Sequence, residues 1–404
     1  TFARSWWPVL ALLALAGAAY RGVWDLGFAS EDFLILGHLH QRPLTEVLLE
    51  ELKGPWLGLS FVSFYRPIST VLLALELRLW GLDPTPFHLA HLLLHGVNSC
   101  LVWSIARRLI PSSAALPLAA GALFAVSPLH PSAVAFVGSY ATIFGGFFSL
   151  LALATYLASR SSRRKGPYAV ALAASALALG SYEGAVALPV VLAMASLLLH
   201  GQALAVEPAR RWQRSLEALR PAVPFFLLLA AYFFLRRAVL GVLVGGYGVF
   251  RERLLSHFLD LLGDFLASLP LLIVPDLHRL PSLVGEALVG ALLAVSSLAF
   301  FLLGRRRQPL AAVALAALVW TFVFELPISF VRVLPATGRF WYLASFSATL
   351  MGLTLLAGAL SAVRSRRPSK LTANFVGGGA LGALLLLQLG WLRSDLALYR
   401  LADL

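Results

Sequence analysis

The chain has 404 residues, of which 59% are hydrophobic and only 13% charged, and its net charge is +13. A soluble domain carries roughly 25% charged residues, so this composition excludes a soluble globular protein. The basic residues stand in short clusters between apolar runs rather than on one polar surface, which excludes nucleic acid as their partner. The single cysteine, Cys100, lies within an apolar run and excludes disulfides and cysteine-based metal sites.

Apolar runs of roughly 17–25 residues, long enough to cross a bilayer, recur along the chain and predict an all-α integral membrane protein. The first run ends without a small-residue cleavage site, so we interpret it as a spanning helix and not as a removable signal. With every arginine cluster in the cytoplasm, the chain has about eleven spanning helices. In chain order these are residues 6–24, 87–106, 115–129, 143–158, 168–180, 185–200, 221–240, 283–303, 310–325, 341–363 and 372–391.

This topology predicts one polytopic domain, residues 1–404, in the cell (inner) membrane, with a cytoplasmic N-terminus and an external, periplasmic C-terminus. Its two large external segments are residues 25–86 and 241–282. Each contains an apolar stretch with polar side chains, at 67–80 and 254–274. If either stretch spanned the membrane, later arginine clusters would be forced outside. We therefore expect both stretches to be juxtamembrane or re-entrant helices.

Most carboxylates fall in or beside the predicted external segments, while the cytoplasmic loops hold mainly Glu207 and Glu217. Carboxylates at a membrane interface are costly and usually mark function, so an external site for general-base chemistry or metal binding is expected. Glu31 and Asp32 are the first acidic pair outside. The commoner meaning of such a pair is structural, because Ser30 could cap a helix whose first turn holds both acids.

Three histidines, His88, His91 and His95, are spaced for one face of a helix. Three histidines on a face could bind a metal ion, but such residues more often form hydrogen bonds between helices. His130 stands between two prolines, which suits a turn, with a catalytic role as the alternative. The glycines at 377–379 lie in an apolar run that lacks the lysine of a phosphate loop, so no nucleotide site is predicted.

A set of short motifs occurs in a familiar order along nearly the whole chain. They are Tyr-Arg-Pro-Ile-Ser-Thr at 65–70, Leu-Trp-Gly-Leu-Asp-Pro at 79–84, Phe-His-Leu-Ala-His at 87–91, Ser-Pro-Leu-His-Pro-Ser-Ala-Val at 127–134, Ser-Tyr-Glu at 181–183, Gly-Arg-Phe-Trp-Tyr-Leu at 338–343 and Trp-Leu-Arg-Ser-Asp at 391–395. In this order the motifs resemble the polyprenyl-phosphate-dependent glycosyltransferases of the GT-C superfamily. The closest likeness is to the membrane O-mannosyltransferases that carry C-terminal tetratricopeptide repeats.

The resemblance implies a GT-C-like helical bundle with juxtamembrane helices in the first external loop. It implies an inverting transferase that moves a sugar from a polyprenyl-phosphate donor to a hydroxyl of a protein or glycan acceptor, at the external face of the bilayer. Asp32 would be the catalytic base, assisted by Glu31, or the pair would hold a divalent metal ion. Arg66 and Arg339 would bind the donor phosphate. Further candidates to line the site are His130, Glu183, His91 and Tyr342.

The sequence also departs from the family pattern. Acidic or basic residues of the motifs are replaced here by Ser132, Tyr140, Thr142, Tyr182 and Gly338, and the tetratricopeptide repeats are absent from this chain. An alternative is therefore a catalytically decayed relative that acts as a structural or accessory subunit of a membrane complex. A transporter is a third hypothesis, which the lack of internal repeats and of paired helices broken by glycine or proline disfavours.

Overall fold

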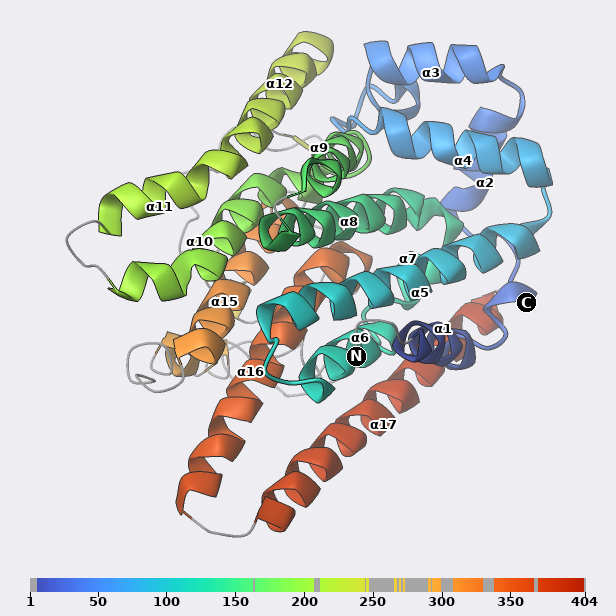
Figure 1. The fold of residues 1–404 in the computed structure, drawn as a ribbon. Helices are drawn as coiled ribbons and strands as arrows, with labels where there is room; N and C mark the ends of the chain where they lie inside the picture. The colour runs from blue at the N-terminus through green and yellow to red at the C-terminus, as the bar shows by residue number, and fades with distance from the viewer. Residues whose placement is uncertain are drawn as a thin grey trace.

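The computed structural model describes residues 6–162, 164–206, 211–243, 245–246, 265–266, 269, 272, 290–291, 293–298, 308–329, 338–366 and 370–402. Within these ranges the chain is helical and contains no strand (Figure 1). The predicted all-α fold is confirmed.

The first half of the chain supplies ten α-helices. They are α1 (Trp7–Ala19), α2 (Glu31–His40), α3 (Leu44–Lys53), α4 (Pro67–Trp80), α5 (Pro84–Leu109), α6 (Ala115–Ala125), the short α7 (Pro131–Val134), α8 (Tyr140–Ser162), α9 (Lys165–Leu179) and α10 (Leu188–Val206). The second half supplies α11 (Arg211–Leu219), α12 (Val223–Leu240), α15 (Gln308–Ser329), α16 (Tyr342–Arg366) and α17 (Lys370–Ala402). Two short 3-10 turns bear on the site, η4 (Val137–Ser139) and η9 (Gly338–Trp341).

Seven helical segments of the described chain are long and apolar enough to cross a membrane. They are Pro84–Leu109, Val137–Ser162, Glu183–His200, Trp212–Leu240, Pro309–Pro327, Gly338–Ser361 and Leu381–Tyr399. Three further predicted spans form shorter apolar helices, Trp7–Ala19, Ala115–Ala125 and Lys165–Leu179. The multi-pass membrane protein is confirmed. Most of the span predicted at 283–303 and of the stretch at 254–274 lies outside the described residues.

Helix α4 has the bounds that the sequence predicted, because residues at both ends fix them. Pro67 occupies the first turn, where its missing N–H has no intrahelical partner to lose. Gly81 follows the helix with a φ of +62°, a conformation that side chains disfavour. Fourteen residues make about 21 Å of helix, too short for a bilayer core of roughly 30 Å. This length agrees with a juxtamembrane helix.

The prediction that Ser30 caps α2 with its side chain is wrong. Ser30 precedes the helix with a φ of +51°, and its hydroxyl makes no capping hydrogen bond. Asp32, inside the first turn, instead accepts a hydrogen bond from the backbone N–H of Ala29. The Asp32 side chain therefore points back toward residue 29, ahead of the helix, and the backbone there fixes its position.

Helices α5 and α8 pack together at the centre of the bundle, and α1 and α6 pack against α5 (Figure 1). The outer helices carry apolar side chains that face away from the protein, including Leu227 and Phe234 on α12 and Leu386 on α17, all more than 60% exposed. A surface this apolar suits contact with lipid chains.

Candidate functional site

Asp32 is the more enclosed carboxylate of the predicted acidic pair. Its side chain is only 1% exposed, although the residue lies in the first turn of α2. The Oδ1 atom accepts a hydrogen bond of 2.5 Å from the backbone N–H of Gly138, and Oδ2 accepts one of 3.0 Å from Ala29. Gly138 belongs to η4, which leads into α8. The two backbone donors therefore fix both carboxylate oxygens.

Burial raises the pKa of Asp32 from its usual value to about 6, although the hydrogen bonds from Ala29 and Gly138 act in the opposite direction. A carboxylate with this pKa is a stronger base than an exposed aspartate. It is nevertheless mostly ionised at neutral pH. Both properties are those required of a general base.

Glu31 and Arg339 form a second part of the site beside Asp32. The Glu31 carboxylate is half-exposed, and its Oε2 lies 3.8 Å from a terminal nitrogen of Arg339. Arg339 comes from η9, ahead of α16, and its other terminal nitrogen lies 3.4 Å from the Ser139 hydroxyl. Its guanidinium also stacks over the ring of Phe136, 5.3 Å from the centroid. Residues from α2, η4 and η9 are thus brought together.

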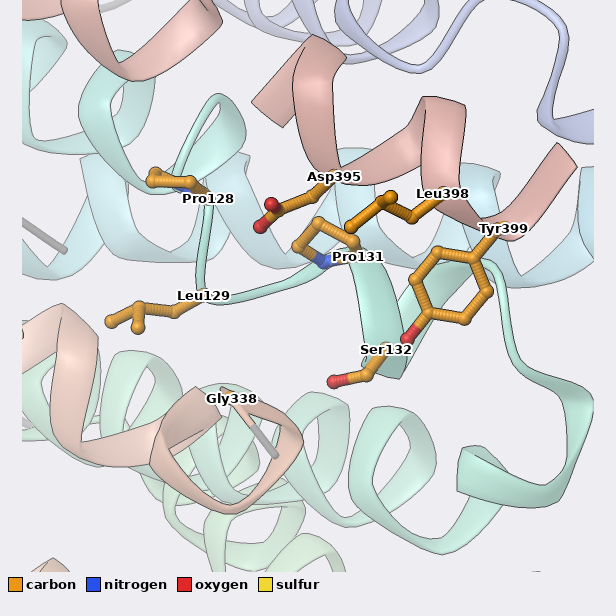
Figure 2. A pocket seen from close by; sticks show the side chains of 8 residues that line it. All are labelled: Pro128, Leu129, Pro131, Ser132, Gly338, Asp395, Leu398 and Tyr399. Carbon is orange, nitrogen blue, oxygen red and sulfur yellow. The ribbon is translucent and has the colours of Figure 1, made fainter. Parts of the chain in front are cut away.

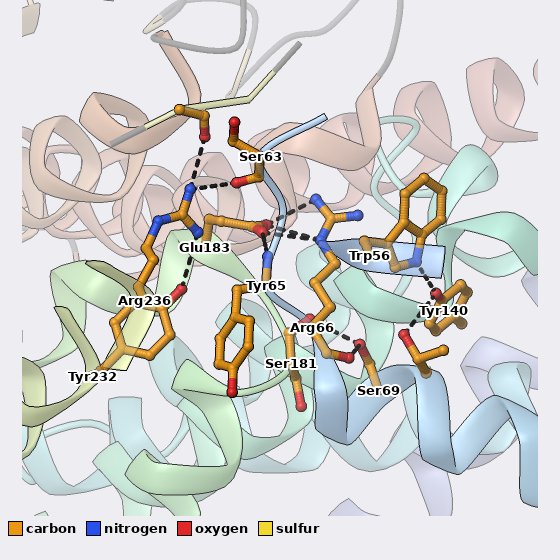
Figure 3. Close-up of polar contacts among 12 residues, drawn as sticks. Trp56, Ser63, Tyr65, Arg66, Ser69, Tyr140, Ser181, Glu183, Tyr232 and Arg236 are labelled. Carbon is orange, nitrogen blue, oxygen red and sulfur yellow. Dashed lines mark hydrogen bonds and ion pairs between the residues drawn. The ribbon is translucent and has the colours of Figure 1, made fainter. Parts of the chain in front are cut away.

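Arg66 and Glu183 form a separate and tighter ion pair (Figure 3). The Nη2 and Nε of Arg66 lie 2.8 Å and 2.9 Å from Glu183 Oε2, and the guanidinium stacks over Phe64 at 4.0 Å. Glu183 also accepts a hydrogen bond from the backbone N–H of Tyr65. Burial alone would lower the pKa of Arg66, but the charge and hydrogen bonds of Glu183 outweigh it and raise that pKa. The charge of Arg66 is therefore already balanced within the protein.

A third arginine, Arg236 of α12, links the segment before Arg66 to the segment after α12 and was not predicted from the sequence. Its guanidinium donates a hydrogen bond to the backbone carbonyl of Ser63 (Figure 3). It also donates to the carbonyls of Leu243 and Gly245. The side chain is only 3% exposed. The one sequence signal for it is a pair of arginines inside an otherwise apolar helix, because a buried arginine in such a helix needs several acceptors.

His91 lies on α5 and is fully buried, with its Nε2 3.5 Å from Glu76 Oε2. Its ring packs edge-on against Phe144. His88 on the same helix face contacts the carbonyl of Gly27 at 3.3 Å. The ring of His95 packs 5.2 Å from that of Tyr20. The three histidines thus have different partners and do not converge on one point.

His130 and Tyr342, two further candidates, belong to a polar network inside the bundle. The Tyr342 hydroxyl lies 2.8 Å from His95 Nδ1 and accepts a hydrogen bond from Asn98. The Nε2 of His130 lies 2.8 Å from the Ser345 hydroxyl. All of these side chains are buried. This network joins α5 to α16.

Sequence reasoning also missed Glu51, a buried acid on α3. Its Oε1 accepts a hydrogen bond of 2.7 Å from the backbone N–H of Leu57, and burial raises its pKa to about 7. Nearby, the Trp56 indole donates to the Tyr140 hydroxyl (Figure 3). Glu51 stands in a helix with a polar face, where an acid normally points to solvent, so nothing in the pattern marks it as buried.

The carboxylate oxygens of Asp32 and Glu31 are not arranged as ligands of a divalent metal ion. Both oxygens of Asp32 accept backbone hydrogen bonds, and Glu31 lies beside a cation. Across the described part of the chain no three His, Cys, Asp or Glu side chains are grouped so that they could hold a metal ion. We therefore assign no step to a metal.

The chain has relatives among curated proteins, although no family model matches it. It is 32% identical over 178 residues to protein O-mannosyl-transferase Tmtc1 of Drosophila melanogaster, which covers 43% of this chain and 21% of that protein. It is 36% identical over 99 residues to tmtc2 of Xenopus laevis and 31% identical over 126 residues to TMTC2 of Homo sapiens. These matches cover 24% and 31% of this chain, and 12% and 15% of those proteins.

Among solved structures, the fold aligns with ArnT from Cupriavidus metallidurans bound to undecaprenyl phosphate, with a TM-score of 0.44 and 16% identity. The alignment covers 99% of this chain and 76% of ArnT. The chain spans about a fifth of the length of Tmtc1 and less of the other two curated relatives. The resemblance indicated by the ordered motifs is confirmed at the level of sequence, since a substantial part of this membrane chain is similar to the protein O-mannosyl-transferases.

Proposed function

We propose that this chain is a membrane glycosyltransferase that moves a sugar from a polyprenyl-phosphate donor to an acceptor hydroxyl. The observation that carries the proposal is Asp32, a buried acid with a raised pKa that is held by two backbone N–H groups and directly follows Glu31, the partner of the cation Arg339. An enclosed base near a cation is the pair that glycosyl transfer from a phosphate requires.

In the proposed step, the acceptor oxygen attacks the anomeric carbon of the donor sugar as its proton passes to Asp32. The new carbon–oxygen bond forms while the bond to the phosphate oxygen breaks, and that oxygen leaves with the electron pair as polyprenyl phosphate. The attack comes from the side opposite the leaving group, so the configuration inverts. Because Asp32 is almost fully buried, the proposal requires the segment around Gly138 to move aside when the acceptor binds.

Arg339 is the residue that we assign to the donor phosphate, because its partner Glu31 is half-exposed and 3.8 Å away, which leaves the cation able to exchange partners. A guanidinium stabilises the negative charge that develops on a leaving phosphate. Arg66 is paired closely with Glu183, which favours a role in positioning the first external loop. Glu31 would then release Arg339 as the donor enters.

The names of the relatives specify mannosyl transfer to protein, and we propose the same sugar and acceptor class here. The reaction would take place at the external face of the inner membrane, with the N-terminus in the cytoplasm and the chain forming one transmembrane domain. This placement is supported by the positive-inside arrangement of the arginine clusters. Other membrane subunits are not required by the proposal.

The proposal is tested by measuring transfer of labelled mannose from a polyprenyl-phosphate donor to a peptide bearing serine or threonine, with the protein in liposomes. Asp32→Asn should reduce turnover by about 10²–10⁴-fold, because the amide keeps the shape but cannot take a proton. Binding of the donor lipid should be retained. Glu46→Gln, an exposed acid on α3, is the matched control and should be active. Full turnover in Asp32→Asn removes the assigned base, and an inactive wild type across donors and acceptors favours the accessory-subunit alternative.

A further inference from the structure

A cavity of about 370 Å³ lies between the turn that enters α7, the start of η9 and the C-terminal part of α17 (Figure 2), but the polar cluster around His91 lies elsewhere, on α5. The His91 side chain is 0% exposed, and its Nε2 is 3.5 Å from Oε2 of Glu76 on α4. Within the described part of the chain, both ring nitrogens of His91 and this Oε2 atom are buried without a hydrogen-bond partner. Buried polar atoms without partners cost free energy, which a favourable charge interaction between the two groups would offset.

The packing of α5 brings His91 to the same corner of the bundle as Asp32. One turn earlier on α5, His88 contacts the carbonyl of Gly27, ahead of α2, at 3.3 Å. The ring of His91 packs against Phe144 of α8, with 5.9 Å between the centroids, and η4 at the start of α8 donates to Asp32. Helix α4 packs on both α2 and α5. His91 therefore lies where the helices that carry the two acids meet.

The charge of His91 acts on Asp32. Burial raises the pKa of Asp32 to about 6, while the hydrogen bonds from Ala29 and Gly138 and the positive charge of His91 lower it. A nearby opposite charge favours the ionised form of a carboxyl group, and carboxylates near an imidazole favour its charged form. Glu76 and Asp32 are both carboxylates near the same ring, so each can stabilise a cation there.

The other titratable groups around this cluster have partners of their own or are exposed. On α2, Glu31 lies beside Arg339 of η9. On α5 itself, His95 lies within hydrogen-bond distance of the Tyr342 hydroxyl. The titratable or charged residues on the further elements that pack against α5 are exposed Asp25 of η2, Arg78 of α4, which donates to the carbonyl of Arg42, and Tyr140, Tyr156 and Arg160 of α8, which contact Trp56, Ser196 and His200. The nearest charged partner of His91 in the described chain is therefore Glu76.

We propose that His91 is a positioning residue for the reaction, protonated with Glu76 as its counter-ion, and that its charge keeps Asp32 ionised. The inference rests on the proposed function for the role of Asp32 as the base. His91 acts through Asp32 and takes no proton from the acceptor. Glu76 acts one step further away, because it stabilises the charge on His91.

The first experiment measures the titration of Asp32 without any turnover. Infrared spectroscopy of the full chain in nanodiscs follows the protonated-carboxyl band that Asp32→Asn removes, as a function of pH. His91→Gln should raise the midpoint of this titration by about one pH unit, because a neighbouring positive charge is lost. Glu76→Gln should also raise it. The sign distinguishes the two explanations, because a carboxylate that acted on Asp32 directly would repel its charge, and its removal would lower the midpoint.

Matched variants separate this effect from a general change in charge or packing. Glu76→Asp keeps the carboxylate and should titrate close to wild type. His40→Gln, an exposed histidine on α2, and Glu46→Gln, an exposed acid on α3, should leave the midpoint unchanged. The double variant His91→Gln with Glu76→Gln should shift the midpoint no further than His91→Gln alone, because Glu76 acts through His91. If His91→Gln does not fold, the comparison of Glu76→Gln with Glu76→Asp decides the same question.

Steady-state kinetics then separates this inference from the proposed function. In an active enzyme, the acid limb of kcat/KM should move with the infrared midpoint, and the donor KM should stay near its wild-type value. If the midpoint shifts as expected but wild type transfers no sugar, the role of His91 stands and the proposed function fails. A midpoint that is unchanged in His91→Gln, or that falls or is unchanged in Glu76→Gln, overturns the inference whether or not the enzyme is active.

Discussion

The backbone N–H of Gly138 donates a hydrogen bond of 2.5 Å to Oδ1 of Asp32, across 106 residues of sequence. The contact joins the first turn of α2 to the turn before α8. It also explains why glycine suits position 138, because a Cβ atom there would lie 3.1 Å from Asp32 Oδ1 and 2.9 Å from the ring of Phe136. The N–H group that holds the candidate base therefore belongs to a residue, Gly138, at which a side chain would not fit.

Gly138→Ala should lower turnover without unfolding the protein, because the added methyl group pushes on the Asp32 carboxylate and on Phe136. We expect a loss of about tenfold or more in kcat, since a small displacement of a catalytic group is costly. Gly37→Ala on α2 is the control, because a Cβ there meets nothing within 4 Å. That variant should be active and more stable by about 0.5–1 kcal/mol. Equal kcat values for the two variants would contradict the positional role of Gly138.

Turnover should rise with pH through about 6, the pKa to which burial raises Asp32. A base acts only when ionised, and a group with this pKa is about one-tenth ionised at pH 5 and about nine-tenths at pH 7. The measurement is kcat/KM against pH, which reports groups of the free enzyme. The residual activity of Asp32→Asn should lack this acid limb. If the kcat/KM of wild type instead falls only near pH 4, Asp32 has the pKa of an exposed, hydrated aspartate in the working enzyme.

The ion pair of Arg66 and Glu183 should matter for stability. Glu183→Gln should lower the free energy of unfolding by about 3 kcal/mol, because it leaves a nearly buried guanidinium without its counter-charge. Arg42→Ala removes the more exposed partner of Glu50 and should change stability by less than about 1 kcal/mol. Thermal unfolding in detergent compares the two. A double variant, Arg66→Met with Glu183→Leu, should recover part of the lost free energy of unfolding. If Glu183→Gln does not destabilise the protein, the ion pair is hydrated.

Arg339→Ala should act mainly on the donor. Loss of a charge-assisted contact to phosphate should raise the donor KM by roughly 10- to 100-fold and leave the acceptor KM near its wild-type value. Arg237→Ala, an exposed arginine on α12, controls for the change in net charge. A donor KM that moves equally in both variants would mean that only the overall field of the protein attracts the lipid phosphate.

The sequence predicts elements whose ends are fixed locally. Helix α4 has its predicted bounds because Pro67 and Gly81 act on the backbone beside them. The end of α17 differs from the prediction, because the last predicted span ends at residue 391 whereas the helix continues to Ala402. Residues 391–402 contain no proline or glycine that would end the helix.

The contacts of the candidate site depend on packing between distant segments and could not be predicted. Arg66 and Glu183 were both singled out, but their pairing depends on how α4 and the turn before α10 meet across 117 residues. Likewise, the acidic pair was recognised, whereas its two residues differ sharply in exposure, which a sequence pattern does not encode. Glu51 was missed for the same reason.

The position of Arg236 has a mechanical consequence. One planar guanidinium from α12 supplies donors to the carbonyls of residues 63, 243 and 245, and its rigid fork fixes their directions more strictly than a lysine ammonium would. Separating the loop before Arg66 from the end of α12 would leave a buried cation without acceptors. The two segments should therefore move as one rigid unit, so that any displacement of the loop before Arg66 tilts α12 with it.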